Sequence, residues 1–186
     1  MGEVAENYQN ICDQVAKIAI NCGRNPNEIE IVAVTKGFSW EHVLPSYQAG
    51  CRNFGESRLQ EATTKMQEAP KDAKWHLIGT LQKNKVSKAV GKFYLIHSVD
   101  SVELARKISD SSQGKTKILL QANISGESSK HGLNAEQWKK EIETIIDLPG
   151  IAIEGLMTMA PLVEDEKAIR RTFSGLRSLR DELVQI

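Results

Sequence analysis

Cysteine is scarce in this sequence, and long hydrophobic runs are missing from it. Its three cysteines, Cys12, Cys22 and Cys51, are an odd number and form no Cys-x-x-Cys pair. A disulfide framework or a zinc knuckle is therefore not expected, and reduced thiols indicate a cytoplasmic protein. No apolar run approaches the roughly 18–20 residues of a membrane span, and the polar, acidic start does not resemble a signal peptide. We expect no membrane association.

An excess of charge of one sign is also lacking, because 24 Lys and Arg residues balance 24 Asp and Glu residues. Nucleic-acid binding driven by bulk charge is therefore not expected. The four histidines show no metal-binding spacing, and no Gly-x-Ser-x-Gly elbow supports hydrolase chemistry. The Gly-Lys-Thr triplet at 114–116 does not complete a P-loop, because Ser109 stands where the first glycine is required.

Short apolar runs alternate with longer amphipathic stretches, which is typical of an α/β protein. The pattern predicts strands at 29–36, 52–55, 75–80, 93–99, 117–124 and 151–159. It predicts helices at 3–22, 40–49, 57–68, 83–90, 101–112, 135–147 and 164–185. The first strand is nearly continuously apolar, as in a strand buried on both faces. Asp100 and Glu103 form a capping-box pattern for the fifth helix, and Asn134 and Gln137 cap the sixth.

Each predicted strand is followed by a helix, and the short connections predict parallel βαβ units. The turn after the first strand carries one glycine, which disfavours a doubly wound nucleotide-binding sheet. A (β/α)8 barrel has eight strands and takes about 200–250 residues or more. The sequence therefore predicts a single domain over 1–186, an incomplete barrel with six of the eight strands. The first and sixth strands would be unpaired edges.

Lys36 is the first candidate functional residue, because it ends the first predicted strand. The carboxyl ends of barrel strands form the active-site face. A lysine that loses its proton there attacks a carbonyl group and forms a Schiff base. The alternative is an ordinary solvated lysine at a strand end.

Other candidates have an equally simple structural interpretation. His76 and His97 lie in or beside apolar strands, where a hydrogen-bonded core histidine is the plainer alternative to a ligand. The lysines at 83, 85 and 88 form either a solvated helix face or a phosphate contact. The polar segment 125–130 is either a ligand-binding loop or a plain turn.

Six segments together resemble the pyridoxal phosphate homeostasis proteins, a family whose fold is that of the N-terminal barrel of alanine racemase. They are IVAVTK (31–36), FGESRLQEA (54–62), WHLIGTLQKNK (75–85), HSVDS (97–101), QANISGESSKHGL (121–133) and GLMTMAP (155–161). The resemblance implies a TIM barrel of PLP fold type III that binds pyridoxal 5'-phosphate (PLP). It also implies a cytoplasmic monomer that holds PLP without established catalysis, with PLP-dependent apoenzymes as partners.

The resemblance assigns the site residue by residue. Lys36 matches the lysine that holds PLP as an aldimine, and a mostly buried strand end would favour the unprotonated amine that this requires. Ser57 stands where the family has asparagine near the cofactor. The remaining cofactor-binding candidates are His76, Gly79, Met157 and Lys130.

The resemblance also implies that relatives continue for about 40 residues, over the last two strands of the eight-stranded barrel. Those strands supply most of the phosphate contacts and an arginine facing the pyridine nitrogen. We therefore expect a C-terminally truncated chain that binds PLP weakly. Three alternatives stay open: a PLP-dependent racemase or decarboxylase-like enzyme, a degenerate barrel scaffold that no longer binds PLP, and a lysine-dependent aldolase barrel.

Overall fold

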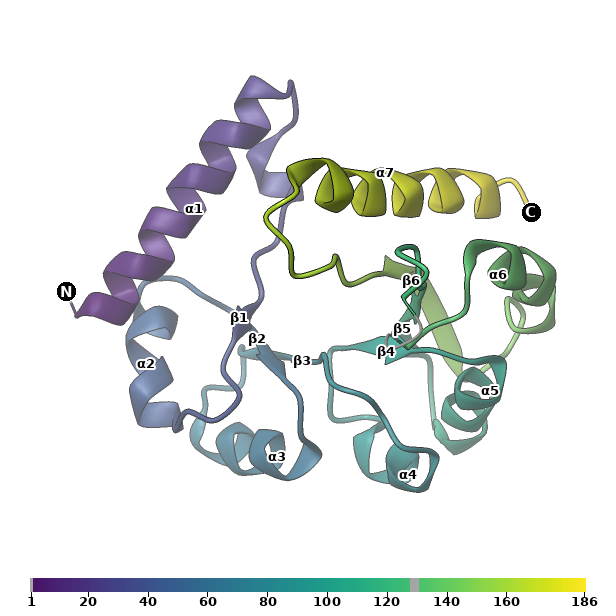
Figure 1. The fold of residues 1–186 in the computed structure, drawn as a ribbon. Helices are drawn as coiled ribbons and strands as arrows, with labels where there is room; N and C mark the ends of the chain where they lie inside the picture. The colour runs from purple at the N-terminus through teal and green to yellow at the C-terminus, as the bar shows by residue number, and fades with distance from the viewer. Residues whose placement is uncertain (1, 128–130) are drawn as a thin grey trace. The chain divides into compact units, whose positions relative to one another are not determined.

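The computed structural model describes residues 2–127 and 131–186. It divides into two compact units, Met1–His76 and Leu77–Ile186. Figure 1 colours the first from purple to blue and the second from teal to yellow. Lys130 lies outside the described residues. The prediction of a single domain over 1–186 stays a prediction.

The first unit alternates helices with short strands. Its elements are α1 (Glu3–Asn21), a 3₁₀ turn η1 (Pro26–Glu28), β1 (Ala33–Val34), α2 (Trp40–Gln48), β2 (Asn53–Glu56), α3 (Leu59–Glu68) and β3 (Lys74–Leu77). The strands are neighbours in sequence order, and β1 pairs with β2 in parallel. The core contains an aromatic cluster in which the Phe54 ring lies 5.5 Å from Trp40 and 5.4 Å from Trp75.

The strand expected at 29–36 is much shorter than predicted. Only Ala33 and Val34 pair, and Val34 is 53% exposed, so the prediction of a strand buried on both faces is wrong. Within the described residues β1 has a single neighbour, β2. A strand with one partner has about half the interstrand hydrogen bonds of a central strand. The rest of the apolar segment 29–36 therefore does not pair as a strand.

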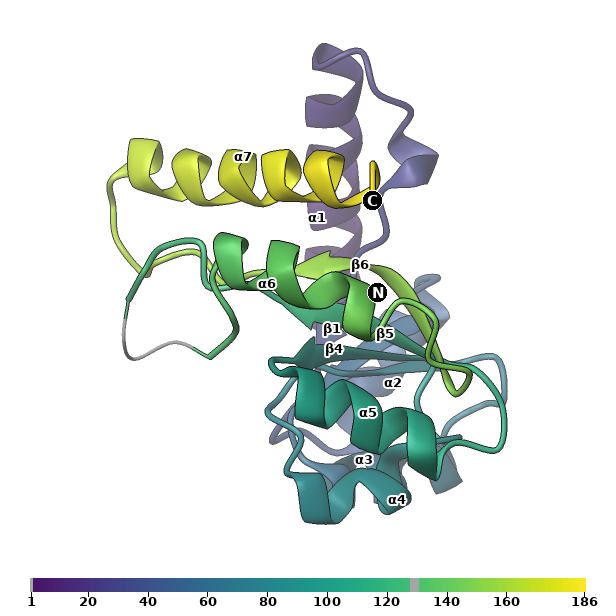
Figure 2. The same ribbon diagram turned by 90° about the vertical axis from the view of Figure 1, so that its right-hand side faces the viewer.

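The second unit contains the other three strands. Its elements are η2 (Lys83–Lys85), α4 (Val86–Ala89), β4 (Leu95–Val99), α5 (Val102–Ser111), β5 (Thr116–Gln121), α6 (Ala135–Glu141), η3 (Ile142–Thr144), β6 (Ile151–Met157) and α7 (Glu166–Leu183). The strands pair in parallel in the order β4, β5, β6. Figures 1 and 2 show α5 and α6 covering one side of these strands.

One predicted helix cap is confirmed and one is wrong. Asn134 and Gln137 form a complete capping box, with both side chain to backbone bonds at 2.9 Å. The fifth helix is capped by Ser101, whose Oγ accepts a hydrogen bond from the Leu104 amide, and not by Asp100. Counting from Ser101, Leu104 occupies the third helical position, so Glu103 is out of register for a capping box.

All six expected strands and all seven expected helices are present, with different ends. The expected helix at 83–90 begins as a 3₁₀ turn, and the one at 135–147 ends as one. Tighter turns of this kind are common at helix ends, where hydrogen bonds between residues three apart replace those four apart. The α/β fold with six of eight barrel strands is as predicted.

Candidate cofactor-binding site

Lys36 projects from a tight turn directly after β1. The Phe38 amide donates a hydrogen bond to the Thr35 carbonyl at 3.2 Å, which closes a four-residue turn. Gly37 has φ +81, the value that the third position of a type II turn requires and that favours glycine. Thr35 is buried and Lys36 is exposed, so the chain changes from core to surface in one residue. The mostly buried surroundings expected for the Lys36 amine are not found.

The residue before Lys36 is held by a buried ion pair. Lys65 of α3 lies with its Nζ 2.5 Å from Glu56 Oε1, and their side chains are 7% and 0% exposed. The Lys65 ammonium also donates to the Thr35 carbonyl at 2.6 Å, and the Thr35 hydroxyl donates to Glu56 Oε1 at 2.5 Å. The carbonyl and the hydroxyl of Thr35 are thus bound by this pair, and its amide donates to the Gly55 carbonyl at 3.0 Å.

The residue after Lys36 is held by a second side chain of α3. The Gly37 amide donates to Glu61 Oε2 at 3.2 Å. The other oxygen of Glu61 accepts from Arg58 Nη1 at 2.9 Å. The pKa of the Glu61 carboxyl is lowered from its ordinary value of 4.5. The main cause is the hydrogen bond from Arg58, and the next is the hydrogen bond from the Gly37 N–H. Glu61 is therefore an anionic acceptor for this backbone amide at neutral pH.

Two further predicted site residues lie in the first unit. Ser57 is half-buried directly after β2. His76 is 2% exposed on β3, with Nε2 3.0 Å from Asn53 Oδ1 of β2. Phe54 and Trp75 pack together in the aromatic cluster. Because side chains alternate along a strand, Asn53 and His76 point to the opposite face. A buried, hydrogen-bonded His76 fits either interpretation, and its role stays a prediction.

Gly79 and Met157 belong to the second unit. Gly79 lies two residues after β3, and its carbonyl accepts a hydrogen bond from Ser98 Oγ at 2.6 Å. Met157 is the last residue of β6 and is half-buried, and its carbonyl accepts from the Ala122 amide at 2.8 Å. His97 on β4 is also half-buried, and burial lowers the pKa of its imidazole. Gly79 therefore lies just after a strand that ends earlier than the expected 75–80, and Met157 lies at a strand end. Their roles as cofactor contacts stay predictions.

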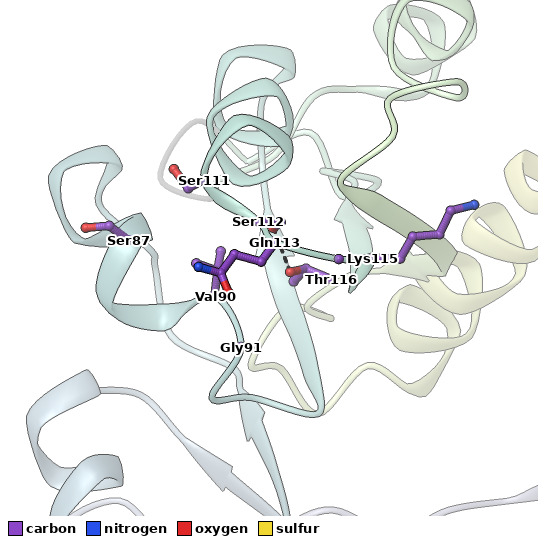
Figure 3. A pocket seen from close by; sticks show the side chains of 9 residues that line it. Ser87, Val90, Gly91, Ser111, Ser112, Gln113, Lys115 and Thr116 are labelled. Atoms are coloured by element: carbon purple, nitrogen blue, oxygen red, sulfur yellow. Dashed lines mark hydrogen bonds between the residues drawn. The ribbon is translucent and has the colours of Figure 1, made fainter.

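A polar cavity of about 410 Å³ in the second unit lies at the other ends of the strands (Figure 3). Its wall comes from α4, the end of α5, the residues that follow each helix, and the start of β5. Ser112 and Thr116 share a 2.8 Å hydroxyl–hydroxyl bond there. Lys115 points away from the other labelled side chains in Figure 3. Parallel α/β folds bind ligands at the carboxyl ends of their strands, so this cavity is not the cofactor site.

Within residues 2–127 and 131–186, no helix is both long and apolar enough to cross a membrane. In the same ranges no group of three or more His, Cys, Asp or Glu residues is arranged to hold a metal ion.

Sequence reasoning missed three residues around Lys36, namely Glu56, Glu61 and Lys65. A signal for them was present, because Glu56 and Glu61 are the two acidic residues of the FGESRLQEA segment. Lys65 follows Glu61 by four positions, a spacing that places both on one face of a helix. What the sequence does not show is that this face of α3 meets the turn at 35–37.

The fold of parallel strands alternating with helices is that of an alanine racemase N-terminal domain. The family model described as "Alanine racemase, N-terminal domain" matches residues 7–186. The solved alanine racemase of Clostridium difficile 630 has a TM-score of 0.74 at 16% identity, covering 96% of this chain and 47% of that one. At that identity the likeness concerns the fold alone.

Relatives of higher sequence identity show which family within this domain class the chain belongs to. The curated "Pyridoxal phosphate homeostasis protein" of Aquifex aeolicus is 35% identical over 183 residues, 96% of this chain and 80% of its own length. The chain therefore belongs to the pyridoxal phosphate homeostasis protein family, as its resemblance predicted. The structure of PipY from Synechococcus elongatus "with PLP bound" has a TM-score of 0.80 at 31% identity, covering 98% of this chain and 82% of that one. A protein from Bifidobacterium adolescentis described as unknown reaches 0.92 at 33%, covering 98% and 79%.

Proposed function

We propose that this protein binds PLP through Lys36 and serves intracellular PLP homeostasis without catalysing a reaction of its own. The observation that carries the proposal is the exposed amine of Lys36 on a fixed turn after β1. It is supported by relatives that are named for PLP homeostasis and by the PLP-bound PipY structure.

The residues around Lys36 fit such a group. When PLP is bound, its aldehyde carbon forms a C=N bond with a lysine nitrogen, and the aldehyde oxygen leaves as water. Lys36 offers its amine to solvent, and Ser57 offers a hydroxyl donor after the neighbouring strand. We further propose His76, Gly79, Met157 and Lys130 as cofactor contacts, which rests on their positions in the family segments.

The test is covalent labelling. Protein mixed with PLP is reduced with borohydride, digested and mapped, and its visible absorbance is recorded before reduction. We expect reduced PLP on Lys36 in the native protein and in Lys17→Ala, which removes an exposed lysine of α1. Lys36→Ala should lose both the label and the visible band. Label spread evenly over surface lysines would contradict the proposal.

The absence of catalysis is tested separately. The support for it is that the relatives are named for homeostasis and not for a reaction. PLP-loaded protein should neither racemise nor decarboxylate a panel of amino acids. Turnover that disappears in Lys36→Ala would instead assign a racemase or decarboxylase-like enzyme.

We also propose that the protein is a cytoplasmic monomer that passes PLP to PLP-dependent apoenzymes. This rests on the family resemblance and on the open position of Lys36. Loaded protein should restore the activity of a PLP-depleted apoenzyme faster than the equivalent free PLP does. Equal rates would leave the protein as a store of PLP and not a donor.

A further inference from the structure

Lys36 stands between two residues that are both held by one helix. Lys65 of α3 binds the carbonyl of Thr35, at 2.6 Å. Glu61 of α3 binds the amide of Gly37, at 3.2 Å. The two α3 residues are four positions apart, so their side chains project from the same face of the helix.

The spacing on the helix matches the spacing on the turn. Four residues of α-helix rise about 6 Å, and two residues of extended chain span at most about 7 Å. One helical turn of α3 therefore reaches from Thr35 to Gly37, with Lys36 between them. Lys36 itself takes no part in these bonds, and its side chain remains at the surface.

The buried pair of Lys65 and Glu56 contributes little to the free energy of unfolding. Removing two charges from water costs free energy that their attraction only partly returns. Glu56 Oε2 is buried and has no hydrogen-bond partner among the described residues, so the carboxylate is not fully satisfied. A geometric role explains why charged groups occupy this site.

The carboxyl end of β1 is held by few interstrand hydrogen bonds, so additional contacts are required to fix it. β1 is two residues long and pairs only with β2 in the described part of the chain. Few ladder hydrogen bonds therefore fix its carboxyl end. The Thr35 carbonyl compensates by accepting two bonds, one from Lys65 Nζ and one from the Phe38 amide.

We propose that α3 is the positioning element for Lys36. Lys65 and Glu56 together fix Thr35, and Glu61 fixes Gly37. With both neighbours fixed, the backbone of Lys36 is held and the direction in which its side chain projects is set. These three are positioning residues, since they act through the backbone beside Lys36. The purpose of the arrangement rests on the proposed function, whereas the restraint on the turn rests on the contacts alone.

The test compares two independent perturbations. The double variant Glu56→Gln/Lys65→Met removes both buried charges at similar volume. Glu61→Ala removes the acceptor for the Gly37 amide, and Glu61→Gln retains an oxygen in its place. Gln60→Ala changes an exposed residue of α3 and serves as the matched control. Amide hydrogen exchange at Thr35 and Phe38 reports the turn, and the rate of borohydride-trapped PLP labelling reports Lys36.

We expect exchange at these amides to rise about five- to tenfold in the double variant and in Glu61→Ala, as for the loss of about one hydrogen bond. Labelling of Lys36 should slow by a similar factor, while Glu61→Gln and Gln60→Ala stay near the native values. Unchanged exchange, or faster exchange with unchanged labelling, would overturn the proposal. Should the double variant fail to fold, the Glu61 pair decides alone.

Failure of the proposed function would look different. Native protein would then carry no PLP on Lys36, while exchange at Thr35 and Phe38 would still respond to the variants. Exchange that does not respond would overturn the role of α3 whether or not PLP binds.

Discussion

The Lys65 ammonium lies 2.6 Å from the carbonyl oxygen of Thr35, thirty positions earlier in the chain. It also contacts Glu56 at 2.5 Å, inside a region from which water is almost excluded. One cation of α3 thus binds both β2 and the residue that follows β1, at the start of the turn that carries Lys36.

Removing one partner of the Lys65–Glu56 pair should lower the free energy of unfolding much more than removing both. Lys65→Met leaves Glu56 buried without its cation, and we expect a loss of about 3–5 kcal/mol in the free energy of unfolding. Glu56→Gln/Lys65→Met should recover most of that loss, because no uncompensated charge remains. Urea unfolding of the three proteins measures the difference. Equal destabilisation in the single and double variants would contradict this account.

Glu61 predicts a loss of stability in acid. Its folded pKa lies below the ordinary 4.5, chiefly because of Arg58 and then the Gly37 amide, with Lys65 also contributing. Its contribution is therefore present above the ordinary value and is lost as the pH falls through the lowered pKa. Urea midpoints of native protein and Glu61→Gln should converge over that acidic range. Parallel curves through it would be the opposing result.

His97 predicts a second pH window, at higher pH. Burial lowers its folded pKa below the ordinary 6.5, so the unfolded chain binds the proton more readily. The free energy of unfolding should therefore fall as the pH drops from 6.5 through the lowered pKa. His97→Gln should flatten this slope, and His42→Gln, which removes an exposed histidine, should retain it. A slope that survives in His97→Gln would exclude His97 as its source.

Gly150 should tolerate no side chain. A Cβ at this position would lie 2.1 Å from the Ser109 carbonyl oxygen, and the Gly150 amide already donates to Ser109 Oγ at 3.0 Å. Because the obstructing atom is backbone, we expect Gly150→Ala to destabilise by about 1–3 kcal/mol. Gly114→Ala is the matched control, since a Cβ there meets nothing within 4 Å. Thermal unfolding compares them, and equal midpoints would refute the steric argument.

The sequence predicted the order of strands and helices well, because hydrophobic periodicity reports which elements face a core. It predicted their ends less well. The run at 29–36 resembles a central strand, yet only Ala33 and Val34 pair, since pairing depends on neighbours that a local pattern does not contain. The cap at Ser101 was missed by one residue for a similar reason, as two adjacent residues were both able to cap.

The site was predicted only in part. Lys36 was found because it ends an apolar run, and the structure places it on the turn after β1. Glu56 and Lys65 were not found, because they lie 21 and 30 positions from Thr35 and contact it only after folding. Charged residues are ordinarily assigned to the surface from sequence, and burial of this pair is a tertiary event.

The shortness of β1 has a consequence for which substitutions the protein tolerates. None of residues 29–34 is fully buried, so the strand itself presents few side chains whose exchange would disturb the core. The geometry at its end is encoded instead at positions 56, 61 and 65, in a different helix and strand. The direction of Lys36 therefore depends on charged residues far along the chain, and not on the short strand that leads to that lysine alone.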